Sequence, residues 1–188
     1  MNADAAWARE VAHDLLANPL PRRWAHTQGV ARKAQDLASI LGDQANLLEA
    51  AAWLHDIGYS PAIALTGFHP LDGARYLRDV AGADDVLCRL VAGHSCADIE
   101  ARERGFAEAL SSEFPSADAF LNRALIYCDM TTTPDGEPVE VAQRLAEIRK
   151  RYGPAHVVTR FTRLAEPHLV GAVQDIREKA NSAGPRSI

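Results

Sequence analysis

The sequence predicts an all-α fold, a single compact helical bundle. Apolar residues recur at helical spacing through most of the 188 residues. Clusters of Pro, Gly and Asp separate these segments, and no convincing β-type alternation runs longer than four residues. With 47% hydrophobic residues, the chain is long enough for one sizeable core and hardly for two. We therefore expect one domain over residues 1–180 and a disordered tail at 181–188.

The first three helices are expected in the N-terminal third of the chain. One covers residues 4–17 and ends at the Asn-Pro-Leu-Pro run at 18–21, which cannot continue a helix. The second runs from about 22 to 41, where Gly42 and Asp43 end it. The third covers 44–56 and is apolar nearly all round, so we expect it at the centre of the core.

The rest of the chain continues the pattern of helices and breakers. Ser60 and Pro61 open a loop or short helix over 60–67. A charged helix at 97–110 is expected to be exposed. The segments at 111–116 and 131–138 contain Pro or Asp-Gly and predict a loop and a turn. The other expected helices cover residues 69–80, 83–94, 118–130, 139–152 and 155–179.

Composition excludes several classes of protein. A net charge of −5 argues against a broad surface for nucleic acid or anionic membranes. Cys88, Cys96 and Cys128 form no C-x-x-C pair, which indicates reduced thiols. The N-terminus lacks the apolar core of a signal peptide, and no run approaches the roughly 18 apolar residues of a membrane span. We expect a cytoplasmic protein that binds neither nucleic acid nor membrane.

Histidines and carboxylates at helix ends are the residues that indicate chemistry. His55 and Asp56 stand together where an apolar helix ends, although this pair alone is also explained by a helix cap and a solvated carboxylate. Polar side chains at such ends can turn into a shared cleft without burying an unpaired charge. Imidazole and carboxylate ligands suit Fe, Mn, Zn, Co or Ni, and the lack of a thiolate cluster argues against structural zinc. His55, His94 and Asp129 lie at such ends; with His26 on the second helix, Asp56, and His69 at the start of a later helix, the full set is His26, His55, Asp56, His69, His94 and Asp129.

The order of these residues resembles that of the HD-domain superfamily of metal-dependent phosphohydrolases. The resemblance covers about residues 20–135 and includes His26 followed by Thr-x-x-Val, and Trp-Leu-His-Asp-Ile-Gly at 53–58. It leaves the C-terminal helices at 138–180 outside. The resemblance implies a first metal site with a bridging Asp56, and a second metal held with the help of His69 and His94, as in small bacterial members with six ligands. The implied metal ligands are His26, His55, Asp56, His69, His94 and Asp129.

This resemblance also implies a reaction. Two divalent metals that share a carboxylate make hydroxide available at neutral pH and clamp a phosphate for in-line displacement. Arg23 lies three residues before His26, on nearly the same helix face, and is the best candidate to bind the phosphate charge; Arg75 and Arg123 are weaker ones. We expect a monomer or homodimer that hydrolyses phosphomonoester or phosphoanhydride bonds of a small nucleotide-like substrate, with Asp56, His69, His94 and Arg23 taking part in catalysis.

Other interpretations stay open at this point. Some HD-fold proteins with the same six-ligand order are di-iron oxygenases, and the ligand types suit iron as well. A catalytically silent nucleotide-binding or regulatory module is the third possibility. If one metal binds, His69 and His94 contact the substrate instead. Thr131–Thr133 follow Asp129 and are candidates to line the pocket. The last helices either cover the site or form a dimer face with Arg144, Arg149, Lys150, Arg151 and Arg160.

Overall fold

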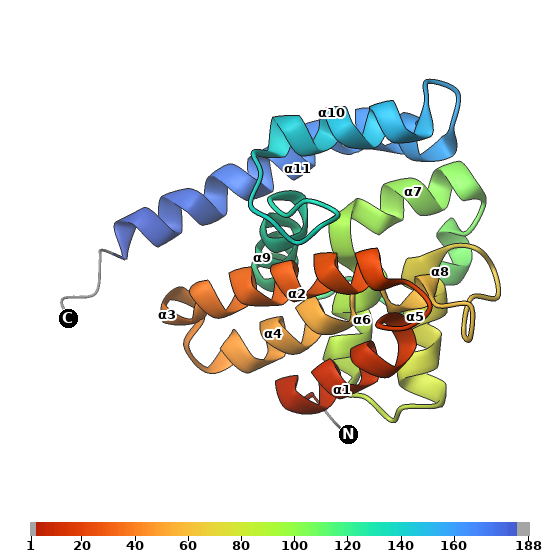
Figure 1. Ribbon diagram of the computed structural model, residues 1–188, viewed down its shortest axis with the longest axis horizontal. Coiled ribbons are helices and arrows are strands. Elements are labelled where there is room, and N and C mark those ends of the chain that lie inside the picture. The colour runs from red at the N-terminus through yellow and green to blue at the C-terminus, as the bar shows by residue number, and fades with distance from the viewer. Residues whose placement is uncertain (1–2, 184–188) are drawn as a thin grey trace.

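The structure is a computed structural model that describes residues 3–183, and it is built from helices (Figure 1). Within these residues no segment forms a strand, and an isolated β-bridge pairs Thr132 with Pro138. The predicted all-α class is therefore confirmed. No helix of the described part has the length and apolar character needed to cross a membrane.

The N-terminal helices pack around the most apolar one. α1 (Ala5–Leu16) and α2 (Pro21–Asp36) both pack on α4 (Ala45–Leu54), and the short helices α3 (Ala38–Leu41) and η1 (Gly42–Gln44) connect α2 to α4. Six of the ten residues of α4 are buried, which places it in the core as predicted. His55 follows directly as the C-cap of α4. The central helix thus ends at the His55–Asp56 pair.

The middle of the chain adds helices on one side of α4. In Figure 1 these helices, coloured yellow to green, lie to the right of α4 and below α10. The short helices η2 (Ile57–Tyr59) and η3 (His94–Cys96) begin directly after the His55–Asp56 pair and after α6, respectively. The longer helices are α5 (His69–Asp79), α6 (Asp85–Gly93), α7 (Ala97–Arg104) and α8 (Ala107–Glu113).

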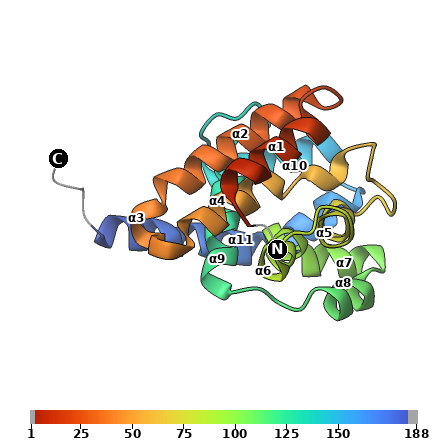
Figure 2. The ribbon, with the colours of Figure 1, turned by 90° about the horizontal axis from the view of Figure 1, so that it is seen from below.

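The C-terminal helices form a layer over one face of the bundle. α10 (Val141–Tyr152) and α11 (Val157–Ser182) pack on each other and on α9 (Ala119–Met130), and Figures 1 and 2 show α11 projecting past the other helices. α9 belongs to two hydrophobic clusters: Leu121 and Leu125 pack in the main core, whereas Ile126 and Met130 pack with α10 and α11. Asp129, near the end of α9, therefore lies where the two clusters meet.

Two predicted helices are interrupted, and the predictions were wrong at these points. The helix expected over 22–41 ends at Leu37. The Leu37 amide donates to the carbonyls of Ala34 and Gln35, and α3 begins at the next residue. The helix expected over 97–110 ends at Gly105, which adopts a left-handed φ of 79° that favours glycine. α8 then continues to Glu113, so the loop expected from residue 111 begins only after it.

Two further predictions are corrected, and one alternative is decided. α7 is not simply exposed, because Glu100 and Ala101 are buried. Of the loop or short helix expected over residues 60–67, the structure has the loop: a series of turns held by the buried Asp72, whose carboxylate accepts hydrogen bonds from the amides of residues 65–67. α11 runs to Ser182, so residues 181 and 182 of the expected disordered tail are helical; the rest of that prediction, from residue 184 on, lies outside the described residues.

Candidate metal centre

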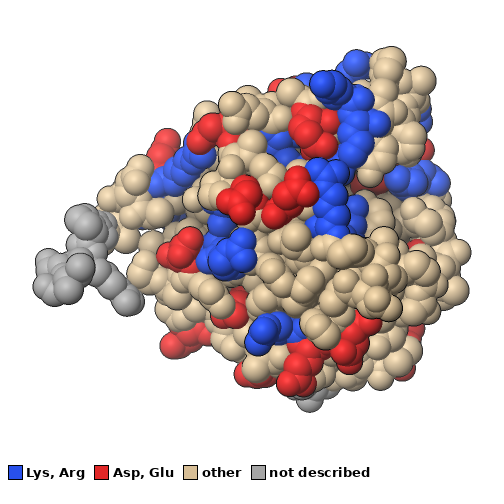
Figure 3. Space-filling view, viewed as in Figure 1, with Lys and Arg blue, Asp and Glu red and all other residues tan. Residues whose placement is uncertain are grey.

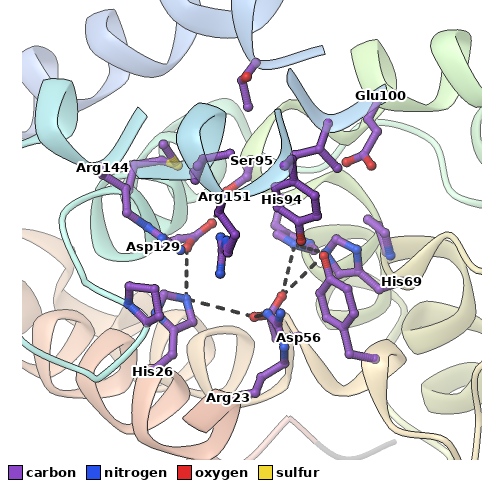
Figure 4. Close-up of a pocket in the computed structure, with 18 of the residues that line it drawn as sticks. Arg23, His26, Asp56, His69, His94, Ser95, Glu100, Asp129, Arg144 and Arg151 are labelled. Carbon is purple, nitrogen blue, oxygen red and sulfur yellow. Dashed lines mark hydrogen bonds and ion pairs between the residues drawn. The ribbon is translucent and has the colours of Figure 1, made fainter. Parts of the chain in front are cut away.

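The structure brings all six predicted ligand residues together around one cavity of about 380 Å³ (Figure 4). Their donor atoms fall into two groups, and within each group the atoms lie within 4.8 Å of one another. Five of the six side chains line the cavity, and the sixth, His55, is fully buried behind them. One group is His26, His55 and Asp129; the other is Asp56, His69 and His94.

His26 is positioned by contacts between α2 and the loop that follows α9. Gly29 lets this loop approach, because a Cβ at Gly29 would lie 2.4 Å from the Gly136 carbonyl oxygen. The loop then offers the Thr133 carbonyl, which accepts a hydrogen bond from His26 Nδ1 at 2.9 Å. His26 Nε2 lies 3.1 Å from Asp129 Oδ1. The close packing of the two segments therefore sets the direction of the imidazole.

His55 and His94 are held by their own helices in the same way. His55 Nδ1 donates to the Ala52 carbonyl at 2.8 Å, and His94 Nδ1 donates to the Val91 carbonyl at 2.6 Å. Because a carbonyl only accepts, the proton is on Nδ1, and Nε2 of the neutral ring keeps its lone pair. His55 Nε2 is buried and has no hydrogen-bond partner among the described residues. Such an orphaned nitrogen, 3.4 Å from Asp56 Oδ2, fits a metal ligand.

Asp56 lies between the two groups of donors. Its Oδ2 atom faces the first group, 3.4 Å from His55 Nε2 and 3.9 Å from His26 Nε2. Its Oδ1 atom faces the second group, 3.4 Å from His69 Nε2 and 3.9 Å from His94 Nε2. Each carboxylate oxygen therefore addresses a different set of imidazoles.

His69 is fixed by the turn that follows the His55–Asp56 pair. Gly58 in η2 packs against the first turn of α5, and a Cβ there would lie 2.0 Å from the His69 carbonyl oxygen. Tyr59 stacks on the His69 ring with a centroid distance of 3.9 Å and an interplanar angle of 19°. His69 Nε2 in turn lies 3.0 Å from His94 Nε2. Two imidazole nitrogens that face each other this closely fit a shared cation.

Arg23 and Ser95 each donate a hydrogen bond to one carboxylate. Arg23 Nη1 donates to Asp56 Oδ2, and its guanidinium carbon lies 3.6 Å from the centre of the Tyr59 ring. Ser95 Oγ donates to Asp129 Oδ2. Ser95 has a left-handed φ of 50°, which costs a non-glycine residue roughly 1–2 kcal/mol. Backbone strain of this kind is typical of functional sites.

The charges around the carboxylates favour their ionised forms. Burial by itself raises the pKa of a carboxyl group. At Asp56 the neighbouring Arg23 guanidinium and His55 outweigh burial and hold the pKa well below its usual range. At Asp129 the hydrogen bond with His26 and the charge of His55 have the same effect on the pKa. Both groups are therefore anionic at neutral pH, the form that binds metal.

The imidazoles do not all shift in one direction. Burial and the neighbouring His94 hold the pKa of His69 well below its ordinary value, and burial and His55 lower the pKa of His94. At His55 burial is outweighed by the adjacent Asp56 carboxylate, which raises its pKa to about 9. His69 and His94 are thus neutral at pH 7, as ligands must be, whereas a cation at His55 Nε2 would take the place of a proton.

Several secondary candidates lie away from the cavity. Arg75 pairs with Glu113, with an Nε–Oε2 distance of 3.0 Å, and Arg123 lies 3.6 Å from Asp175. None of these four side chains lines the cavity, so neither arginine is placed to contact a ligand there. The side chains of Thr131–Thr133 do not line it either: the Thr131 and Thr132 hydroxyls donate to helix carbonyls, and Thr133 contributes its carbonyl to His26.

Other residues that line the cavity were not predicted from the sequence, or were given two alternative roles. α10 covers the cavity and contributes Arg144 and Arg151, whereas Arg149 instead bonds Glu166 of α11. Tyr59 and Ser95 were missed although each stands within three residues of a predicted ligand, a signal that was available. Met130, directly after Asp129, had the same signal. The remaining lining residues from α7, α10 and α11 had no local signal; they include Glu100, Ile148, Tyr152, Val158, Phe161, Thr162 and Leu169.

A comparison with models of known protein families identifies one family that the chain matches. The family model described as HD domain matches residues 23–130, which is more than half of the chain. The matched segment starts at Arg23 and ends directly after Asp129, so it contains all six residues of the candidate centre. Neither a curated protein nor a solved structure matches the chain.

Proposed function

The chain belongs to the HD-domain family, a superfamily of metal-dependent phosphohydrolases, and from this premise we propose that it hydrolyses phosphomonoester or phosphoanhydride bonds of a nucleotide-like substrate. One observation carries the proposal. The two oxygens of Asp56 face two separate groups of imidazoles, at distances of 3.4–3.9 Å. This is the placement that a carboxylate shared between two metals needs.

The donor set fits two divalent metals. His26, His55 and Asp129 would hold the first, and His69 and His94 the second, with Asp56 shared between them. Three of the imidazoles have Nδ1 bound to a backbone carbonyl, which directs Nε2 toward the carboxylates. When bound, such a metal pair lowers the pKa of water and polarises a phosphate.

Protein side chains supply the remaining groups. Arg23 lines the cavity and already donates to Asp56, so its other N–H groups are placed to bind phosphate oxygens that the metals leave exposed. Tyr59 holds both Arg23 and His69 through ring contacts. The apolar side chains of α10 and α11 would exclude water and pack against the organic part of the substrate.

The test combines metal analysis with mutagenesis. Protein purified without added metal or chelator should contain about two divalent metals per chain and release phosphate from a panel of nucleotides. Asp56→Ala should remove both metals and the activity, and His94→Ala should remove one metal, while far-UV circular dichroism stays helical. His168→Ala, an exposed histidine on α11, is the matched control.

The outcomes separate the alternatives. Full metal content and turnover in Asp56→Ala would refute the proposal. Iron together with substrate-dependent consumption of O₂ would instead identify an oxygenase, since the same ligands suit iron. No metal after reconstitution would leave a silent binding module.

A further inference from the structure

Two arginines of α10 extend the cavity beyond the candidate metal centre. Arg144 and Arg151 both line it, and Figure 4 shows their side chains projecting from α10 toward the space around Asp129 and Asp56. α10 lies outside residues 23–130, which the family model matches. No assignment based on the family therefore covers these two residues.

Arg144 carries an unsatisfied donor in the cavity wall. Its side chain is only 8% exposed, and Nη1 donates to Glu147 Oε2 at 2.6 Å. Its Nε is buried and has no hydrogen-bond partner in the described part of the chain. Arg144 therefore keeps hydrogen-bonding capacity that its contact with Glu147 does not use.

Arg144 and Arg151 share a single carboxylate partner, Glu147. Arg151 Nε lies 3.4 Å from Glu147 Oε1, so one carboxylate serves two guanidinium groups and leaves one positive charge in excess. Figure 3 shows basic side chains gathered between the end of α10 and the start of α2, which carries Arg23. The apolar residues Ile148 and Phe161 also line the cavity and strengthen charge recognition by lowering the local dielectric constant.

We propose that Arg144 and Arg151 form a second anion site, which binds an additional phosphoryl or carboxylate group of the same substrate. This inference rests on the proposed function, in which the scissile phosphate lies at the six-residue centre and Arg23. The guanidinium fork suits either anion, because both offer two oxygens to parallel N–H donors. The substrate class is therefore an organic phosphate with a second anionic group, joined by a part that packs against the apolar wall.

Non-hydrolysable probes test the second site without turnover. Alkane bisphosphonates with chains of about three to six carbons are compared with alkyl monophosphonates of the same length, by calorimetry on the protein with its metals as isolated. At the chain length that spans the two sites, we expect the bisphosphonate to bind about 10- to 100-fold more tightly. Phosphonocarboxylates of that length show whether the second group is best a phosphoryl or a carboxylate.

Variants locate the effect on α10. Arg151→Ala and Arg144→Gln should each remove most of the bisphosphonate advantage and leave monophosphonate binding unchanged. Lys150→Ala loses the same charge from an exposed position of the same helix and should retain the advantage. The proposal would be overturned if the two probes bound the unchanged protein with equal affinity. It would also be overturned if the bisphosphonate still bound more tightly than the monophosphonate to a variant that carries both Arg144→Gln and Arg151→Ala. Since no probe is cleaved, a failure to detect hydrolysis would count against the proposed reaction and not against this site.

Discussion

Replacing Gly58 with alanine is expected to displace His69 from the candidate metal centre. Gly58 follows the His55–Asp56 pair by two residues, and its backbone packs directly on the first turn of α5. An added Cβ would lie 2.0 Å from the His69 carbonyl oxygen and 2.7 Å from the Gly73 amide nitrogen. Both atoms belong to the backbone, so no side-chain rotation relieves the overlap.

The size of the effect follows from these distances. Real Cβ atoms essentially never approach closer than 3.0 Å, so the start of α5 must move by at least the difference from 2.0 Å, 1.0 Å. Forcing a group into a packed position costs about 2–3 kcal/mol. For a protein of this length we expect the melting temperature to fall by roughly 5–10 °C. Because His69 moves with α5, the group of Asp56, His69 and His94 should also lose the metal that we propose for it.

Gly73→Ala provides a matched control on the facing helix. There an added Cβ would lie 3.2 Å from the Gly58 amide nitrogen, which requires a shift of only a few tenths of an ångström. We expect a loss of under about 1 kcal/mol and unchanged metal content. Differential scanning calorimetry and elemental analysis measure both quantities. A Gly58→Ala protein with the melting temperature and metal content of the unchanged protein would refute the reasoning.

Three further substitutions test other contacts of the site. Arg23→Ala should lower kcat/KM by roughly 10- to 100-fold and leave the metal content unchanged, as kinetics and elemental analysis can show. Ser95→Gly keeps the left-handed backbone but removes the hydroxyl that donates to Asp129, so metal affinity measured against a chelating dye should fall about tenfold or more. Burial raises the pKa of Glu100, against the effect of Arg104. Its contribution to stability is therefore present below the ordinary value of 4.5 and is lost as the pH rises through the folded-state pKa. The melting temperature of Glu100→Gln relative to the unchanged protein should rise from about pH 4 to about pH 8.

Each of these expectations has a contrary result. Loss of metal from Arg23→Ala would mean that the guanidinium is needed to hold Asp56 in place rather than to bind phosphate. If Ser95→Gly and the unchanged protein compete equally well with the dye for metal, the Ser95 hydroxyl does not contribute to metal affinity through Asp129. A difference in melting temperature that stays constant with pH would show that the ionisation of Glu100 does not affect folding.

Most helices were predictable because their ends carry local signals. A Pro or a capping Asp stands at the start of each of α1, α2, α5, α6 and α9. The break at Leu37 has no such signal, since an apolar residue that is only 4% exposed continues the helical pattern. Gly105 was visible in the sequence, but a single glycine inside a helical pattern is often tolerated. The helix ends here because Gly105 adopts a left-handed conformation. A glycine can also adopt the helical conformation, so the residue type alone does not predict the break.

The residues of the candidate centre were predictable because they are chemically distinctive and, His26 within α2 apart, stand near helix ends. Their supporting contacts were not, for two physical reasons. The Nδ1 partners of His26 and His55 are backbone carbonyls of Thr133 and Ala52, which have no side-chain identity to recognise. The cavity wall from α10 and α11 comes from chain segments that meet the centre only through packing on α9, so Arg144 carries no local sign of its position.

The two interpretations of His55 that the sequence left open, helix cap and metal ligand, are compatible in the structure. The last carbonyls of a helix have no partner within it. His55 uses one of them, the Ala52 carbonyl three residues earlier, to fix the proton on Nδ1. The same bond directs Nε2 away from the helix toward Asp56. His94 repeats this arrangement with the Val91 carbonyl at the end of α6. A histidine at the end of an apolar helix thus caps the helix and presents an oriented Nε2 at once, which explains why the candidate centre forms where these helices end.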